Sequence, residues 1–115
     1  MTSTQLTGSN AEDAGLAFLS AKGLDLIARN FRCKGGEIDL IMKAGVELVF
    51  VEVRLRTHGG FGGAAASVSS AKQRRIRIAA QYFLLKNYGP KNWPACRFDV
   101  LAHELNGINW IQGAF

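Results

Sequence analysis

The sequence predicts one α/β domain with a central mixed β-sheet of about five strands flanked by helices, in the order α-β-β-β-α-β-β. Five short runs alternate apolar and polar residues, as strands do, and two longer stretches repeat apolar residues with helical spacing. A hairpin precedes the longer helix, and that helix leads back into a strand, which implies both antiparallel and parallel pairing. The chain has 115 residues, 48% of them hydrophobic, which is enough for one core.

The first helix is predicted over residues 10–22, with apolar side chains recurring along one side. Asn10 can cap its start, and Gly23 can end it. Glu12 and Asp13 suit the positive end of the helix dipole.

Strands are predicted over residues 24–32, 37–42, 47–55, 97–103 and 108–111. Residues 43–46 are few enough to form a hairpin turn. The second helix is predicted to open with a capping box from Ser70 to Gln73 and to fade by Asn87. Residues 57–67 are rich in glycine, which indicates either a lid or DNA-facing loop, or a plain flexible connection.

Acidic residues in the second and third predicted strands stand where a strand normally carries Val or Ile. Glu37 and Asp39 share one face of their strand, and Glu52 and Arg54 share one face of theirs. If Asp39 lies opposite Glu52, then Glu37 lies opposite Arg54, and all four side chains form one patch. Crowded carboxylates repel one another unless a cation lies between them. The pattern therefore predicts a divalent-metal site, on which phosphodiester hydrolysis is the commonest chemistry.

The net charge of +5 and the isoelectric point near 9.6 reflect a modest excess of basic residues. These residues gather in three groups: Arg29, Arg32 and Lys34; Arg54 and Arg56; and Lys72, Arg74, Arg75 and Arg77. Any single group can be a solvated basic surface. Three groups around an acidic site favour a polyanionic partner.

The expected location is the cytoplasm. Residues 1–9 are predicted to be a flexible tail without the basic and apolar segments of a secretory signal, leaving residues 10–115 as the domain. Cys33 and Cys96 are far apart in apolar stretches, which is typical of reduced thiols. No apolar run approaches the roughly 20 residues that span a bilayer, so no membrane contact is expected.

Four motifs together carry a resemblance to a known family. They are Gly-Glu-Ile-Asp-Leu-Ile at 36–41, Val-Phe-Val-Glu-Val-Arg at 49–54, Lys-Gln-Arg-Arg at 72–75 and Cys-Arg-Phe-Asp-Val at 96–100. From about residue 10 to residue 115 the chain resembles the restriction-endonuclease-like fold. Within that fold it looks like the D…(D/E)-x-K nucleases, in particular the archaeal type of Holliday junction resolvase. The closer resemblance is to the YraN family of small bacterial proteins.

The resemblance implies a nuclease site that uses Mg²⁺ or Mn²⁺. Asp39 and Glu52 match the metal-holding aspartate and glutamate, and Glu12 matches a helix glutamate that often joins them. Arg54 stands where these nucleases have a lysine that positions or activates the attacking water. Arginine does not lose its proton in proteins, so Arg54 can hold the scissile phosphate but cannot act as a general base. Together with the strand geometry, this makes Asp39, Glu52, Arg54 and Glu37 the candidate catalytic residues.

Three functions follow from this pattern. The first is a metal-dependent nuclease acting on DNA, branched or damaged, with Lys72, Arg74, Arg75, Arg77 and Arg56 along the DNA backbone. The second is a nucleic-acid-binding module on the same fold without catalysis. The third is an adaptor in which the site is an ion-pair network. The resemblance also allows a homodimer, because many enzymes of this fold cut two strands.

Several of these residues also have a structural interpretation. Arg54 can serve as the counter-ion to Glu37, and Glu12 can simply complement the helix dipole. Asp99 is expected to pair with Arg97 or with an arginine of the second helix. The aromatic residues fit core or turn positions, which does not favour binding of single strands by stacking.

Overall fold

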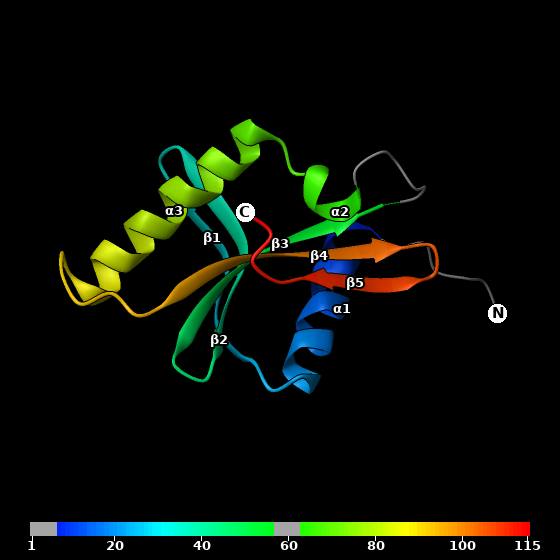
Figure 1. Cartoon of the computed structure of the whole chain (residues 1–115), viewed down its shortest axis with the longest axis horizontal. Helices are drawn as coiled ribbons and strands as arrows, with labels where there is room; N and C mark the ends of the chain where they lie inside the picture. Colours follow the sequence, from blue (N-terminus) through cyan, green and yellow to red (C-terminus); the bar gives the residue numbers. More distant parts are fainter. Residues whose placement is uncertain (1–6, 57–62) are drawn as a thin grey trace.

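The computed structural model of the protein describes residues 7–56 and 63–115 (Figure 1). The helices are α1 (Gly8–Ala21), α2 (Gly63–Ala66) and α3 (Ser70–Tyr88). The strands are β1 (Asp25–Cys33), β2 (Gly36–Ala44), β3 (Glu47–Leu55), β4 (Cys96–Glu104) and β5 (Gly107–Ile111). This confirms the predicted α/β class and element order, with the short helix α2 added before the long one.

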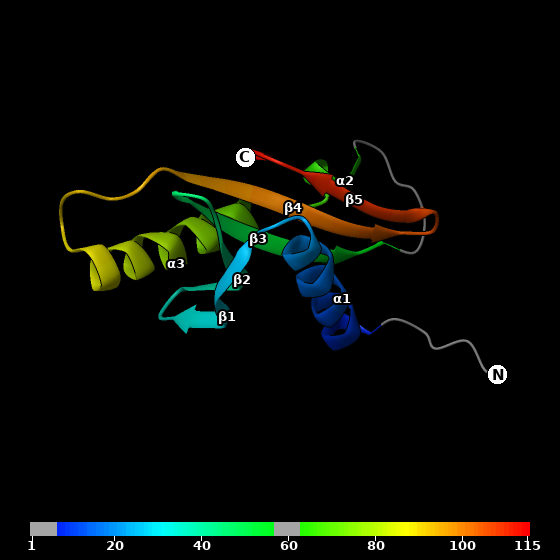
Figure 2. The ribbon, with the colours of Figure 1, turned by 90° about the horizontal axis from the view of Figure 1, so that it is seen from below.

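The five strands form one sheet in the order β1-β2-β3-β4-β5 (Figure 2). Strands β3 and β4 run parallel, because the chain returns through α2 and α3 to the end of the sheet at which β3 begins, and β4 starts there. The other three neighbouring pairs are antiparallel. The mixed sheet expected from the hairpin and the helical crossover is therefore confirmed, as the restriction-endonuclease-like fold requires.

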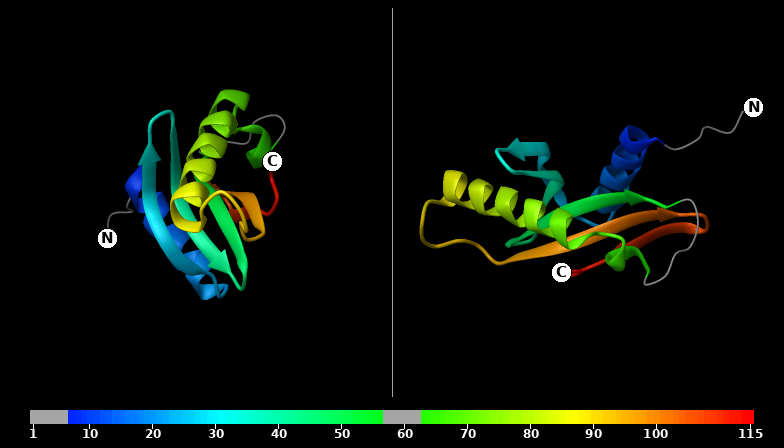
Figure 3. Two further views of the ribbon diagram at one scale, coloured as in Figure 1. Left: turned by 90° about the vertical axis from the view of Figure 1, so that its left-hand side faces the viewer. Right: turned by 90° about the horizontal axis from the view of Figure 1, so that it is seen from above.

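Two hydrophobic clusters form on the two faces of this sheet. Phe50 and Val100 belong to the cluster under α3, together with Ile76 of that helix. Val51 and Leu101, each the next residue along its strand, belong to the cluster that includes Leu19 of α1. Figure 3 shows α3 lying across the β1–β2 hairpin and α1 crossing β3. Successive residues of a strand point to opposite faces, so each helix receives its own set of apolar side chains.

Both helix starts differ from the prediction. Thr7, not Asn10, caps α1, and its Oγ1 accepts a hydrogen bond from the Asn10 backbone N–H at 3.3 Å. Ser69 caps α3, with its Oγ accepting from the Lys72 N–H at 3.1 Å. The predicted capping box is wrong, because Gln73 donates instead to the backbone of Val68. Several capping residues follow one another at both sites, and the position where the backbone turns from extended to helical decides which one acts.

Both segments that the sequence predicts to be flexible lie partly outside the described residues. Of the predicted tail, residues 1–6 lie outside them, whereas Gly8 and Ser9 are the first residues of α1. Of the predicted glycine-rich loop, residues 57–62 lie outside them, and Gly63–Ala66 form α2.

The register of the central hairpin is the one on which the predicted patch was conditional, although the turn is shorter than the predicted residues 43–46. The β2–β3 pairing runs from Ala44↔Glu47 to Leu40↔Val51, which aligns Asp39 with Glu52 one step further along. Regular pairing stops before that step. Instead the Asp39 carboxylate accepts a hydrogen bond from the Val53 backbone N–H at 2.9 Å. Asp39 and Glu52 therefore lie where the two strands stop pairing. There the Asp39 carboxylate, and not a backbone carbonyl of β2, accepts the hydrogen bond from β3.

The alternation of β2 also breaks at Asp39. Ile38 and Ile41 belong to the α3 cluster, whereas Leu40 lies in the cluster under α1. On the β1 side, Asn30 has a left-handed φ of 54°, a conformation that asparagine tolerates better than most residues. The prediction assumed that the residues of β2 alternate strictly between the two faces of the sheet, and this assumption is wrong at Asp39.

Gly36 determines how closely α3 approaches the sheet. A Cβ atom at this position would overlap the carbonyl oxygen of Arg75 and lie 2.8 Å from the backbone nitrogen of Ala79. Only glycine permits this approach of helix backbone to strand backbone. The contact brings the first turn of α3, which carries Lys72, over the start of β2.

Candidate functional site

The predicted patch forms, and a lysine of α3 lies at its centre. Nζ of Lys72 lies 3.0 Å from Oε1 of Glu37 and 3.7 Å from Oε2 of Glu52. Nη1 of Arg54 lies 3.8 Å from the same Glu52 oxygen. Asp39 lies beside Glu52, with one oxygen bonded to the β3 backbone. We call these five residues the acidic–basic cluster: Glu37, Asp39, Glu52, Arg54 and Lys72.

Glu52 is the most buried member of the acidic–basic cluster, with only 4% of its surface exposed. Its Oε1 atom is buried and has no hydrogen-bond partner among the described residues. Burial raises the pKa of Glu52 to about 8, and the charge of Asp39 and the hydrogen bond that a protonated Glu52 donates to Asp39 add to this shift, whereas Lys72 and Arg54 oppose it. An ionised Glu52 therefore needs more positive charge than the protein itself places beside it.

Glu37 differs from Glu52, because cations satisfy it. The hydrogen bond from Lys72 is the main cause that lowers the pKa of Glu37, and Arg75 lies 3.7 Å from the same carboxylate. Burial disfavours the ammonium form of Lys72, but its bond to Glu37 and the charges of the carboxylates leave its pKa raised. Lys72 is therefore a cation shared between Glu37 of β2 and Glu52 of β3.

Arg54 pairs with Glu52 and not with Glu37. Nη2 of Arg54 donates to the backbone oxygen of Ser67 at 3.2 Å, which holds the guanidinium between β3 and the segment after α2. Its Nε is buried and has no partner among the described residues. The interpretation of Arg54 as the counter-ion of Glu37 is therefore wrong, since Lys72 and Arg75 fill that position.

Glu12 pairs with Arg29 of β1, whose Nε lies 3.4 Å from Glu12 Oε1 and whose Nη2 lies 2.6 Å from Asp13. Within residues 7–56 and 63–115, no three His, Cys, Asp or Glu side chains come together as a ready-made metal site. The structure thus brings Asp39 and Glu52 together but does not add Glu12 as a third ligand.

The basic residues of α3 divide into two groups. Arg74, Arg75 and Arg77 are exposed, whereas Lys72 points into the acidic–basic cluster. The guanidinium of Arg77 also lies 5.8 Å from the centre of the Phe98 ring. Arg56 is half-buried just after β3. The sequence identified Lys72 as basic but did not reveal its direction, because the rotation of α3 depends on its contact with Gly36.

Fold and site together define a mixed α/β domain with a buried carboxylate and a shared lysine at the end of its central hairpin. The chain belongs to a family described as "Uncharacterised protein family UPF0102", the YraN family, whose profile matches residues 11–102. It is 52% identical to a UPF0102 protein of Janthinobacterium sp. (strain Marseille), over 98% of this chain and 89% of that protein. It is 55% identical to one of Cupriavidus necator, over 97% of this chain and 84% of that protein.

The family profile spans every member of the acidic–basic cluster and the exposed arginines of α3. In the part of the chain that the structure describes, no helix is both long and apolar enough to cross a membrane.

Proposed function

We propose that the protein binds nucleic acid and that its acidic–basic cluster is a metal-dependent nuclease site acting on DNA, branched or damaged. The observation that carries this proposal is the Glu52 carboxylate. It is buried beside Asp39, and among the described residues one of its oxygens has no partner and its nearest cations lie at 3.7 and 3.8 Å. A buried carboxyl group left short of partners costs stability whether it is ionised or neutral, so this arrangement supports a role with a ligand from outside.

Asp39 and Glu52 fit a hard divalent cation, Mg²⁺ or Mn²⁺. Such ions prefer carboxylate oxygens, and Mg²⁺ is commonly held by only one or two carboxylates, with water and substrate phosphate completing its shell. The unpartnered Oε1 of Glu52 is a suitable ligand atom, and Asp39 supplies a second carboxylate. Bound there, the metal would supply charge stabilisation at the phosphate and a more acidic water.

Lys72 and Arg54 take the role of the single lysine found in related nucleases. Both are cations beside Glu52, and both have N–H groups suited to phosphate oxygens. In hydrolysis the oxygen of water bonds to phosphorus and the bond to one ester oxygen breaks; the water loses a proton and the leaving oxygen gains one. Lys72 and Arg54 would orient the phosphate and stabilise the negative charge that develops on its oxygens.

The exposed arginines of α3 are suited to the DNA backbone. Arg74, Arg75 and Arg77 follow Lys72 along the helix, so cationic side chains continue from the site along one element. Contacts of this kind give affinity without reading the sequence, and the affinity falls as salt rises. The free thiols of Cys33 and Cys96 agree with action in the reducing cytoplasm.

A specific observation favours the alternative, a binding or adaptor module without catalysis. Lys72 already lies between Glu37 and Glu52, where it neutralises part of their charge without a metal. In that case the acidic–basic cluster is an ion-pair network, and added metal leaves the stability unchanged.

Thermal unfolding in EDTA, Mg²⁺ and Mn²⁺ separates the two functions. A ligand that binds only the folded state stabilises it, by about 2.7 kcal/mol at 100 times its Kd. We expect Mn²⁺ to raise the midpoint of the wild type but not of Asp39→Ala or Glu52→Gln. Glu47→Gln is the matched control, because Glu47 lies on the same strand but bonds Arg97. Equal midpoints in EDTA and millimolar Mn²⁺ would remove the metal site from the proposal.

Nucleic-acid binding is tested separately, in EDTA, with a branched DNA and a salt series. Affinity should fall steeply with salt, and the double variant Arg74→Ala with Arg75→Ala should bind more weakly and with a smaller salt slope. Affinity that does not respond to salt would contradict the role of α3. If the wild type then cleaves branched DNA in Mn²⁺ and Glu52→Gln does not, the nuclease function is established.

A further inference from the structure

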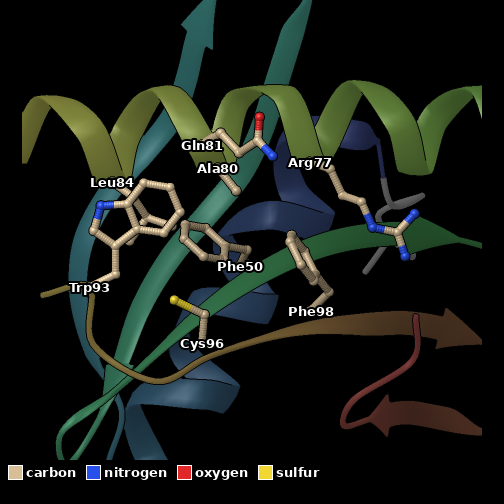
Figure 4. A pocket seen from close by; sticks show the side chains of 8 residues that line it. All are labelled: Phe50, Arg77, Ala80, Gln81, Leu84, Trp93, Cys96 and Phe98. Atoms are coloured by element: carbon tan, nitrogen blue, oxygen red, sulfur yellow. The ribbon is translucent and has the colours of Figure 1, made fainter. Parts of the chain in front are cut away.

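A second feature lies further along α3, on the same side of the sheet. Between α3, β3 and β4 there is a cavity of about 240 Å³ whose walls are almost entirely apolar. Phe50, Phe98, Leu84 and Trp93 line it, with Arg77 and Gln81 of α3 (Figure 4). We call it the α3–β4 pocket.

The aromatic lining of this pocket is partly accessible. The rings of Phe50 and Phe98 are stacked, with their centres 5.4 Å apart. Phe50 is a core residue, as the sequence predicts, but Trp93 leaves 41% of its surface exposed at the pocket wall. The Trp93 indole N–H donates to the backbone oxygen of Gly89 at 2.6 Å, which fixes the ring in place. Phe50 is buried and Phe98 is stacked against both Phe50 and Phe115, so the indole of Trp93 is the aromatic surface of the pocket that is open to a ligand.

The pocket size limits what can enter. Sites that enclose a whole small molecule usually measure about 300–1,000 Å³. The α3–β4 pocket is smaller, so it suits one ring system that belongs to a larger ligand. Arg77 and Gln81 add a cation and a side-chain amide to an otherwise apolar lining, and both residues are exposed. This combination is complementary to an aromatic ring that carries hydrogen-bonding edges and is attached to an anion.

We propose that the α3–β4 pocket receives one unpaired nucleobase of a bound nucleic acid. The base would stack on the indole of Trp93, Gln81 would bond its edge, and Arg77 would bind an adjacent phosphate. This inference rests on the proposed nucleic-acid binding and adds the substrate class: DNA with a base outside the duplex.

The position of the pocket relative to the acidic–basic cluster supports the same substrate. Lys72 and Gln81 are nine residues apart on α3, or roughly 13 Å along the helix axis. Successive nucleotides of a stacked strand are spaced by about 3.4 Å, so this distance corresponds to a few nucleotides. A phosphate at Lys72 and an unpaired base in the pocket can therefore belong to one short stretch of a single substrate.

The test compares three short DNA duplexes in EDTA at low salt by fluorescence anisotropy. One is fully paired, one carries a single unpaired adenine, and one carries an abasic nucleotide at the same place. The wild type should bind the adenine bulge about tenfold more tightly than the abasic one, because stacking of one base is the only difference. In Trp93→Ala this preference should disappear, while affinity for the paired duplex stays.

Tyr88→Ala is the matched control, since Tyr88 is also an aromatic residue with 41% of its surface exposed, and it does not line the pocket. It should keep the preference for the adenine bulge. A second measurement needs no variant: 2-aminopurine placed in the bulge should lose fluorescence when the wild type binds and stacks it.

Equal affinity for the adenine and abasic bulges, with 2-aminopurine fluorescence unchanged, overturns the pocket assignment. The pocket would then be left to an aromatic side chain of a protein partner or to none, while the proposed nucleic-acid binding stands. If none of the three duplexes binds, the proposed function fails, and the pocket inference fails with it.

Discussion

Two buried carboxylates, Glu52 and Asp99, lie one step apart on adjacent strands and differ in almost every interaction. The β3–β4 pairing places Asp99 beside Val51 and Glu52 beside Val100. Asp99 is completely buried, and both of its oxygens accept hydrogen bonds from Nε of Arg97, at 3.1 and 3.2 Å. It also accepts bonds from the Trp110 indole at 2.9 Å and from the backbone N–H of Gly113 at 3.0 Å.

Glu52 has no comparable set of donors. Within the described residues its two cations, Lys72 and Arg54, lie at 3.7 and 3.8 Å, and one of its oxygens has no hydrogen-bond partner. The same sheet can therefore satisfy a buried carboxylate fully, as it does at Asp99. The difference indicates that Asp99 stabilises the fold, and that Glu52 is held short of partners in the free protein.

Removing the satisfied carboxylate should have the largest effect. Asp99→Ala leaves Nε of Arg97, the Trp110 indole and the Gly113 N–H without their acceptor, so we expect a loss of about 3–5 kcal/mol in the free energy of unfolding. Urea denaturation gives this value. Any folded fraction should still show the metal response of the wild type. A loss below about 1 kcal/mol would mean that Asp99 is not the structural member of the pair.

Gly36→Ala should move α3, and so change the surroundings of Glu52 without changing those of Asp99. The added Cβ overlaps the backbone of Arg75, so the helix must shift away from β2, at a cost of about 3 kcal/mol. Lys72 moves with the helix, and the Glu52 environment changes, whereas the bonds of Asp99 involve no residue of α3. A variant as stable as the wild type would show that the close approach at Gly36 does not position Lys72.

In the metal-free protein, the raised pKa of Glu52 should make the free energy of unfolding depend on pH. Its pKa is about 8 in the folded state against an ordinary value of 4.5, so the folded state binds more protons between these limits. The free energy of unfolding therefore falls as pH rises from about 4.5 to about 8, and each unit of difference corresponds to about 1.4 kcal/mol.

We expect a loss of about 2 kcal/mol or more between about pH 5 and about pH 9 that Glu52→Gln removes. Urea denaturation in EDTA measures it, and Glu47→Gln should keep the wild-type slope. If Glu52→Gln and the wild type have parallel pH profiles, Glu52 is not held in its neutral form.

The contrast between the two carboxylates could be predicted only in part from the sequence. Strand periodicity was sufficient to show which acidic side chains share a face, but the register that aligns Asp39 with Glu52 entered only as a condition. The turn predicted over residues 43–46 is two residues longer than the observed turn, because Ala44 already pairs with Glu47. Arg97 was one of the two predicted partners of Asp99, since the two share one face of one strand, and the structure shows this pairing and not one with an arginine of α3. The fold class followed from the order of the elements.

Tertiary packing decided what the sequence left open. The bonds of Asp99 to Trp110 and Gly113 depend on β5 and the segment after it returning alongside β4. The direction of Lys72 depends on Gly36, and the α3–β4 pocket depends on residues from three elements and a loop. No periodicity reports such contacts, because they join residues far apart in the chain.

The smallest expected effect is a difference in stability between variants of Lys72 and Arg75, the two cations that contact Glu37. Lys72 reaches both Glu37 and Glu52, and 25% of its side chain is exposed. Arg75 reaches only Glu37, and 55% of its side chain is exposed. We expect Lys72→Met to cost about 1 kcal/mol above pH 8, where Glu52 is ionised, and less below pH 5. Arg75→Met should cost less than about 0.5 kcal/mol, because solvent screens an exposed pair.

Urea denaturation of both variants at the two pH values measures this difference. The comparison is internal, since both substitutions remove one cation from the same helix and the same carboxylate. A larger loss for Lys72→Met at high pH assigns the difference to Glu52, which is the only other carboxylate among the described residues that Lys72 contacts within 4 Å. Equal losses at both pH values would instead show that Lys72 acts only on Glu37, and that Glu52 is balanced by Arg54 alone.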